Sequence, residues 1–199
     1  NSVGDSLYAV PVQTDITGLW YRRDWLSEAG VAVPTTWTEW LELIDAFAQP
    51  ETRQRFGHTY SLVLPVTAAA TEATVNLLIP FIWMAGGDVL DSAGRLCLDC
   101  PAVSEALDFL RQITLERRHA LPDMTGARVW DLVRYFAHGL VPMALGGSYE
   151  WPRIQDECAW AETPEEAVSH LGFAMAPRPS VECPPISSLG GTSWVITRQ

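Results

Sequence analysis

The stretch LWYRRDWLSEAG, which covers residues 19–30, decides the class of fold. Its first part, together with Gly18, is apolar and aromatic and predicts a strand that ends near Tyr21. Residues 24–29 predict a short helix, and Gly30 follows at the position where a left-handed residue commonly ends a helix. Strands and helices continue to alternate along the chain, so we expect an α/β fold in which helices flank a mixed sheet.

Caps and apolar stripes predict longer helices beyond this unit. Thr36 and Glu39 form a capping box, in which each side chain accepts a hydrogen bond from the other residue's backbone. Pro101 suits the first position of a helix, and the apolar stripe that follows should extend this helix to about Arg118. Further helices are expected at residues 71–85, 129–136 and 162–170.

A continuous apolar run bounded by glycines predicts a buried strand at residues 140–145. Further strands are expected at residues 7–12, 60–64, 95–98, 172–176 and 194–196. The apolar run at residues 75–85 is too short to cross a bilayer, which needs about 20 residues. Four of the tryptophans lie on apolar stripes and should be buried: Trp20, Trp37, Trp40 and Trp130.

The composition excludes several classes of function. The 199 residues include 24 acidic and 13 basic ones, giving a net charge of −11, and such a surface repels nucleic acids. All the basic residues are Arg, which excludes a Lys nucleophile, a Schiff base and the Lys of a P-loop. The sequence has no catalytic triad, nucleophile elbow or cluster of metal ligands, so we expect neither an enzyme nor a cofactor.

The four cysteines allow three interpretations. Cys97 and Cys100 have the spacing of a zinc knuckle, but Cys158 and Cys183 lie too far apart to complete a ligand set. Pro101 follows the second cysteine and places this pair at the end of an expected strand. In a redox-active pair, a helix starts after the first cysteine instead. We favour structural thiols over a disulfide, and a disulfide over a metal site.

Short motifs along nearly the whole chain resemble, in order and spacing, those of the family 1 extracellular solute-binding proteins, the maltose-binding-protein-like receptors of ABC importers. These motifs are LWYRRDWL at residues 19–26, PTTWTEW at 34–40, PFIWMAGGDVLD at 80–91, LDCP at 98–101, FAHG at 136–139, VPMALGG at 141–147 and GFAMAP at 172–177. The resemblance implies a type II periplasmic-binding-protein-like fold, in which two lobes close over a solute by hinge motion.

The resemblance covers only the central part of the family, and the chain is therefore expected to be a fragment. Residues 1–16 should form a strand and the hinge crossing from the first lobe, and residues 17–176 the second lobe. Residues 177–199 should form the loop and strand that return to the first lobe.

The resemblance also implies the function, which is extracytoplasmic binding of a mono- or oligosaccharide for delivery to the permease subunits of an ABC transporter. The location would be the periplasm or the cell exterior, and a lipid anchor at the outer face of the membrane is one such arrangement. Two alternatives stay open. The chain could be the ligand-sensing domain of a larger signalling protein, or a receptor for a non-sugar solute, such as an anion if Arg153 or Arg178 faces the cleft.

The resemblance indicates six candidate ligand-binding residues, namely Asp15, Glu72, Asn76, Tyr149, Glu150 and Gly190. Asp15 matches an acidic sugar contact just after the crossing between lobes, although an Asp that caps a local turn would also fit. Glu72 and Asn76 lie on the helix before the Gly-Gly turn, near the position where relatives present a side chain to the ligand.

The strongest of these candidates is Tyr149, in the stretch GSYEW at residues 147–151. Relatives have GPWxW here, and their first Trp stacks on the sugar. Glu150 could accept a hydrogen bond from a ligand hydroxyl, but we expect it to be solvated. Gly190 could let the returning strand approach the ligand or could simply bend the chain. Asp15 and Glu150 could also form a glycosidase pair, against which the resemblance argues.

Overall fold

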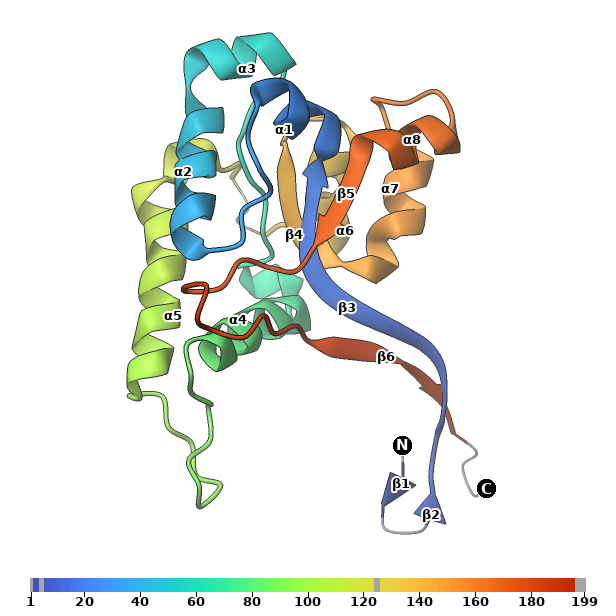
Figure 1. Ribbon diagram of the computed structural model, residues 1–199. Helices are drawn as coiled ribbons and strands as arrows, with labels where there is room; N and C mark the ends of the chain where they lie inside the picture. The colour runs from blue at the N-terminus through green and yellow to red at the C-terminus, as the bar shows by residue number, and fades with distance from the viewer. Residues whose placement is uncertain (1, 4–5, 124–125, 196–199) are drawn as a thin grey trace.

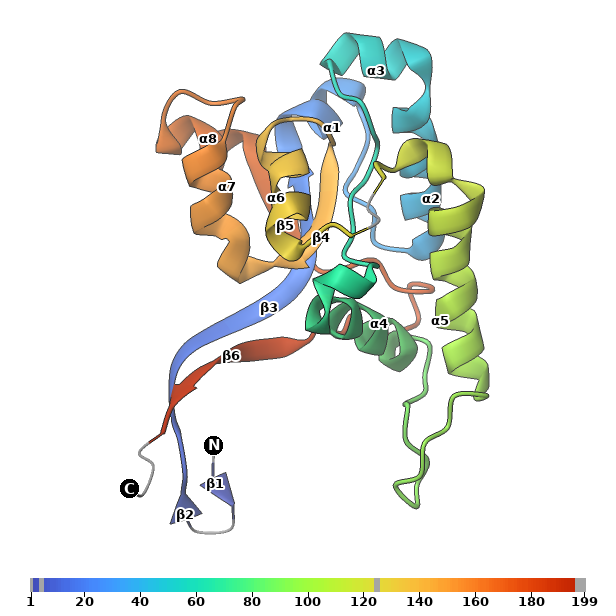
Figure 2. The ribbon, with the colours of Figure 1, turned by 180° about the vertical axis from the view of Figure 1, so that it is seen from behind.

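The computed structural model describes residues 2–3, 6–123 and 126–195 of the chain. Helices surround a sheet to form a body, and a two-stranded ribbon leaves this body and extends toward both ends of the chain (Figure 1). The view from behind shows the same projection of the ribbon (Figure 2). A short hairpin of β1 (Ser2–Val3) and β2 (Ser6–Leu7) lies at its tip.

Strand β3 (Val10–Arg22) connects the body to the ribbon. Its C-terminal half lies between β4 (Met143–Gly147) and β5 (Leu171–Ala174) in the sheet of the body. Its N-terminal half pairs with β6 (Leu189–Trp194) to form the ribbon. All three pairings are antiparallel, and one continuous strand therefore belongs to both parts of the molecule.

This pairing corrects two expectations about the sheet. The strands expected at residues 7–12 and 18–21 are largely one strand, because β3 continues without a turn while its partner changes from β6 to β4 and β5. The expected mixed sheet is antiparallel in every named strand pair of the described residues. A parallel contact beside β4 is present only as an isolated bridge between Val63 and Ala144.

Residues 60–64 lie alongside β4 but do not form the expected strand. The Val63 backbone makes two hydrogen bonds there, at 3.2 Å to Met143 and at 3.0 Å to Leu145. Its neighbour Ser61 instead donates its backbone N–H to the carbonyl of Ala120 at 2.7 Å. The segment follows the sheet edge but bonds alternately to β4 and to loops, so no regular ladder forms.

The other expected strands differ in position or are absent. Residues 95–98 belong to a loop that contains only an isolated bridge between Leu90 and Leu96. The strand expected at 140–145 begins at Met143 and continues to Gly147. The strand expected at the C-terminal end is β6, which ends at Trp194, and Ile196 lies outside the described residues.

The helices are α1 (Arg23–Ala29), α2 (Trp37–Ala48), α3 (Pro50–Phe56), α4 (Glu72–Met84), α5 (Pro101–Arg111), α6 (Val129–Ala137), α7 (Trp151–Glu157) and α8 (Pro164–His170). The capping box of Thr36 and Glu39 is confirmed, as is the left-handed Gly30 with φ of 70°. Figure 2 shows α6 lying over β4 and β5. Within the described residues, no helix combines the length and the apolar character that crossing a bilayer requires.

The helix expected at residues 101–118 is shorter than predicted. It ends as α5 at Arg111 and continues as a π-helical turn, Gln112–Glu116. The hydroxyl of Thr114 donates to the carbonyl of Leu110 at 2.8 Å, and such a side-chain bond competes with the regular ladder. This bond lies where the helix changes its winding.

An aromatic cluster, defined here as Trp37, Phe81 and Phe109, holds α2, α4 and α5 together. The rings of Trp37 and Phe109 stack at 4.2 Å, and Phe81 meets each of them edge to face, at 5.9 and 5.7 Å. The Trp37 indole N–H donates to the carbonyl of Pro177 at 2.9 Å. All three rings are buried, and the only polar atom of the cluster has a partner.

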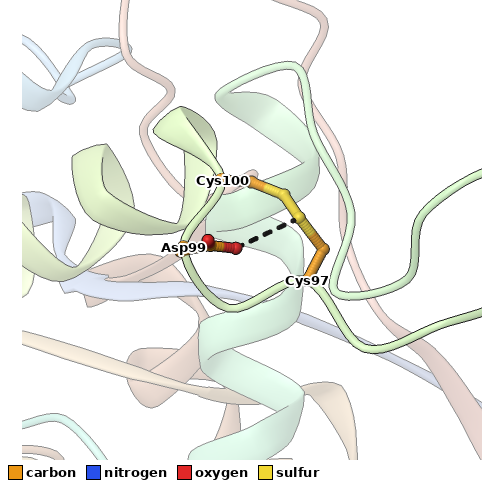
Figure 3. A group of neighbouring side chains, drawn as sticks. All are labelled: Cys97, Asp99 and Cys100. Carbon is orange, nitrogen blue, oxygen red and sulfur yellow. Dashed lines mark hydrogen bonds between the residues drawn. A yellow bond between two sulfur atoms is a disulfide. The ribbon is translucent and has the colours of Figure 1, made fainter.

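Cys97 and Cys100 form a disulfide in the loop that leads into α5 (Figure 3). The preference for free structural thiols is therefore wrong for this pair, because the backbone turns back on itself at residues 97–100 and brings the sulfurs together. Asp99 lies beside the pair, with a carboxylate oxygen 3.7 Å from the Cys97 sulfur. Both sulfurs are used in the bond, which leaves no thiolate for a metal ion. Cys158 and Cys183 are free thiols, as expected.

Candidate functional site

Two adjoining cavities lie where the ribbon leaves the body. The smaller one, of about 70 Å³, reaches down to Leu145 and Gly146 of β4. The larger one, of about 580 Å³, is a hollow between α4, the start of α6 and the ribbon. Its volume falls within the range of roughly 300–1,000 Å³ that small-molecule sites occupy.

All six candidate residues line these cavities. Asp15, Asn76, Tyr149 and Gly190 line both cavities, Glu150 lines the smaller one and Glu72 the larger one. They come from β3, α4, the turn after β4, and β6. The structure thus brings together in space residues that lie up to 175 positions apart in the sequence.

Strand register and side-chain hydroxyls position the residues around Asp15. In the ribbon, Asp15 lies opposite Gly190. The next residue, Ile16, donates its backbone N–H to the hydroxyl oxygen of Ser148 at 3.1 Å. The Ser188 hydroxyl donates to the backbone carbonyl of Asn76 at 2.8 Å. These bonds connect β3, the turn after β4, the segment before β6, and α4 around one hollow.

A second serine joins the two strands of the ribbon at its base. The Ser187 hydroxyl accepts a hydrogen bond from the Thr17 N–H at 2.9 Å and donates one to the Thr17 carbonyl at 2.6 Å. A side-chain hydroxyl therefore satisfies the donor and the acceptor of one β3 residue.

Three glycines leave the space that the candidate side chains occupy. A β carbon on Gly146 would overlap the carboxyl group of Glu150, and one on Gly190 would overlap the carboxylate of Asp15. A β carbon on Gly147 would meet the ring of Tyr149. The glycines of this region are therefore explained by close packing of the site.

Glu150 is buried, with only 5% of its surface exposed, so the expectation that it is solvated is wrong. The 3₁₀ turn Ser148–Glu150 folds the side chain back over Gly146. Burial raises the pKa of Glu150 to about 8, against the lowering effect of hydrogen bonds from the Gly147 backbone and the Trp20 side chain. At neutral pH this carboxyl group is mainly protonated and can donate a hydrogen bond as well as accept one.

Tyr149 is partly buried and lines both cavities. Burial raises the pKa of its phenol to about 12, and the negative charges of Glu150, Asp15 and Glu72 contribute in that order. The phenol therefore stays protonated and offers a donor and an aromatic face to the cavity.

Trp130 is a further residue of the site that sequence reasoning placed in the core. It lines the larger cavity, is 45% exposed, and meets the Tyr149 ring edge to face at 6.1 Å and 90°. The buried residues of α6 are Leu132, Val133, Phe136 and Ala137. Trp130 follows Val129 directly and so lies at the edge of the apolar stripe. This position at the edge was the sequence signal that Trp130 could be exposed.

Neither of the arginines that would indicate an anionic solute lines the cavities. Arg178 donates to the carbonyl of Cys183 at 2.7 Å, near the start of α2. The Arg153 guanidinium lies 5.8 Å from the Trp130 ring centre and forms an ion pair with Glu157. Among the described residues that line the two cavities, none is Arg, Lys or His.

Comparisons with known proteins agree with this arrangement. The model of the family described as bacterial extracellular solute-binding protein matches residues 1–198. The putative ABC transporter periplasmic-binding protein YcjN of Escherichia coli K12 is 27% identical over 154 residues, which are 77% of this chain and 33% of that protein.

Two solved structures extend the comparison. Maltose-bound MalE3 of T. maritima is 26% identical with a TM-score of 0.75, and the match covers 96% of this chain and 45% of that one. A solute-binding protein of Thermotoga lettingae TMO bound with alpha-D-tagatose is 25% identical with a TM-score of 0.76, covering 95% and 45%. The chain therefore spans between a third and a half of the length of these relatives.

Proposed function

The chain belongs to the bacterial extracellular solute-binding protein family, and we propose that it forms the second lobe of a receptor that binds a sugar for an ABC transporter. Maltose and tagatose are the ligands of two structures that it resembles over more than nine-tenths of its length. The family and these relatives are binding proteins of transport systems, which argues against an enzyme.

The observation that carries the proposal is the convergence of the six candidate residues on adjoining cavities at the base of the ribbon. A sugar presents an apolar C–H face and a rim of hydroxyls, and each buried hydroxyl needs a hydrogen-bond partner. Tyr149 would support the apolar face, and Asp15 would accept from hydroxyls. Asn76 offers both a donor and an acceptor, and Gly190 leaves the space that the Asp15 carboxylate occupies.

The division of the chain supports a receptor with two lobes. We assign residues 1–16 to the strand and crossing from a first lobe, residues 17–176 to the second lobe, and residues 177–199 to the return. The partner of β3 changes from β6 to β4 between Ile16 and Thr17, where the proposed crossing ends, and β5 joins as a second partner from Leu19 onward.

The rest of the proposal follows from the family. The receptor would act in the periplasm or at the outer face of the membrane, where a lipid anchor could retain it, and would pass its ligand to the permease subunits of the transporter. Closure of two lobes over the ligand would signal occupancy.

Titration of the chain with maltose and D-tagatose, followed by NMR, tests the proposal. A receptor of this kind typically binds at about micromolar, or roughly −8 kcal/mol, so one of two equal lobes would retain roughly −4 kcal/mol and bind at about millimolar. We expect the signals of Tyr149 and Asn76 to shift with millimolar sugar. Shifts with organic acids alone would contradict the choice of ligand, and micromolar affinity would contradict the assignment of a single lobe.

A further inference from the structure

The acidic and basic side chains that line the two cavities are all acidic among the described residues. Asp15 and Glu72 line the larger cavity together with Tyr149, whereas Glu150 lines the smaller one and is mainly protonated at neutral pH. The described lining residues contain no basic side chain to balance them. The guanidinium of Arg153, which lies outside the lining, is held in an ion pair with Glu157. A neutral ligand would leave this negative potential uncompensated.

A metal ion does not fit these acids. A cation such as Ca²⁺ needs several oxygen ligands at once, all within about 2.6 Å of the ion. Within the described residues, Cys97, Asp99 and Cys100 form the group of three whose ligand atoms lie within 4.8 Å of one another, and the acids of the cavities form no such group. The carboxyl groups are spread around the hollow and suit a cation that is itself part of a larger molecule.

The aromatic residues have the matching chemistry. Trp130 and Tyr149 meet at 90°, so they form a corner with two differently oriented rings. The face of an aromatic ring attracts ammonium groups as well as the C–H surface of a sugar. Trp130 already lies against one cation, the Arg153 guanidinium at 5.8 Å, and it is 45% exposed and lines the larger cavity.

We infer that this lobe selects a carbohydrate that carries a protonated amine over its neutral counterparts. Glu72 and Asp15 would attract the ammonium group, and the Trp130–Tyr149 corner would hold the sugar ring next to it. The inference rests on the proposed function and narrows the class of ligand.

Three disaccharides with one skeleton test this inference: the β-1,4-linked dimer of glucosamine, its N,N′-diacetyl form and cellobiose. Each is titrated into the chain at pH 6 and moderate salt, with the Trp130 indole N–H signal, assigned through Trp130→Phe, as the NMR readout. We expect the free diamine to bind at least tenfold more tightly than the other two, or about 1.4 kcal/mol. Acetylation, which removes the charge but keeps the skeleton, should abolish the preference.

Matched variants identify where the preference arises. Glu72→Gln removes one exposed carboxylate of the hollow and should reduce the preference severalfold, whereas Glu105→Gln removes an exposed carboxylate on α5 and should leave it unchanged. Equal affinity for the diamine and cellobiose would overturn the inference and leave the proposed function intact. Binding of none of the three, nor of maltose or tagatose, would overturn both. A preference equally lost in both variants would show general attraction to the acidic surface and would also overturn the inference.

Discussion

Two pairs of aromatic rings in this molecule have similar geometry and opposite surroundings. Trp37 and Phe81 meet edge to face at 5.9 Å and 88°, and Trp130 and Tyr149 do so at 6.1 Å and 90°. The first pair is buried among apolar side chains. The second is partly exposed and lines a hollow that Asp15 and Glu72 also line. Ring geometry therefore does not distinguish a core contact from a contact that lines a cavity, whereas exposure and neighbouring charge do.

Replacing Trp37, from the buried pair, should have the largest effect on stability. Trp37→Ala removes the stacked ring that joins α2 to α5 and should lower the free energy of unfolding by about 3–5 kcal/mol. Urea unfolding followed by circular dichroism measures the change. A loss below about 1 kcal/mol would mean that the aromatic cluster does not hold these helices together.

Gly146→Ala tests whether the site is packed as tightly as the core. Its β carbon would overlap the Glu150 carboxyl group, so we expect a loss of about 1–3 kcal/mol in the free energy of unfolding. The same substitution in the Glu150→Ala background should cost much less, because the overlapping group is gone. Equal costs in both backgrounds would place the strain elsewhere.

The pH dependence of stability tests the burial of Glu150. Its pKa is about 8 in the folded protein against an ordinary value of 4.5, so the folded state binds more protons between these two values. The stabilising contribution of the neutral carboxyl is therefore complete below about pH 4.5 and is lost as the pH rises through 8. Glu150→Gln cannot ionise and should not show this loss. By pH 9 its free energy of unfolding should therefore exceed that of the wild type by roughly 1–3 kcal/mol. Parallel pH profiles of the two proteins in thermal unfolding would show that Glu150 ionises normally.

Trp130→Ala should have the smallest effect on stability and a clear effect on binding. Because the ring is partly exposed, the free energy of unfolding should change by no more than about 1 kcal/mol. Sugar-induced shifts of the Tyr149 signals should weaken severalfold, since one wall of the hollow is lost. A destabilisation as large as that of Trp37→Ala would show that Trp130 packs as a core residue.

Helix caps were predicted correctly from the sequence, whereas the structure of a segment that depends on distant partners was not. The capping box of Thr36 and Glu39 and the left-handed Gly30 depend on residues within one helical turn, and both were predicted. Residues 60–64 have a strand-like composition, but their hydrogen bonds depend on distant partners in β4 and in the 3₁₀ turn that ends at Ala120.

The candidate site shows the same limit. The resemblance to a family located the six residues, because it carries information about distant positions that come together. It could not predict the burial of Glu150, which depends on how the turn folds over Gly146, or the exposure of Trp130, which depends on what covers the edge of α6. Both properties arise from packing between segments far apart in the sequence.

The serine bonds at the base of the ribbon have a mechanical consequence. Where β3 passes from one partner strand to the next, hydroxyl oxygens of Ser148 and Ser187 accept from the N–H groups of Ile16 and Thr17. A hydroxyl group rotates about its C–O bond and can follow a moving donor, whereas a backbone carbonyl is fixed in its peptide plane. The junction beside Asp15 therefore depends on two side-chain hydroxyls where a regular ladder would use only backbone groups, with the Ser188 carbonyl as a further acceptor for the Thr17 N–H at 3.3 Å.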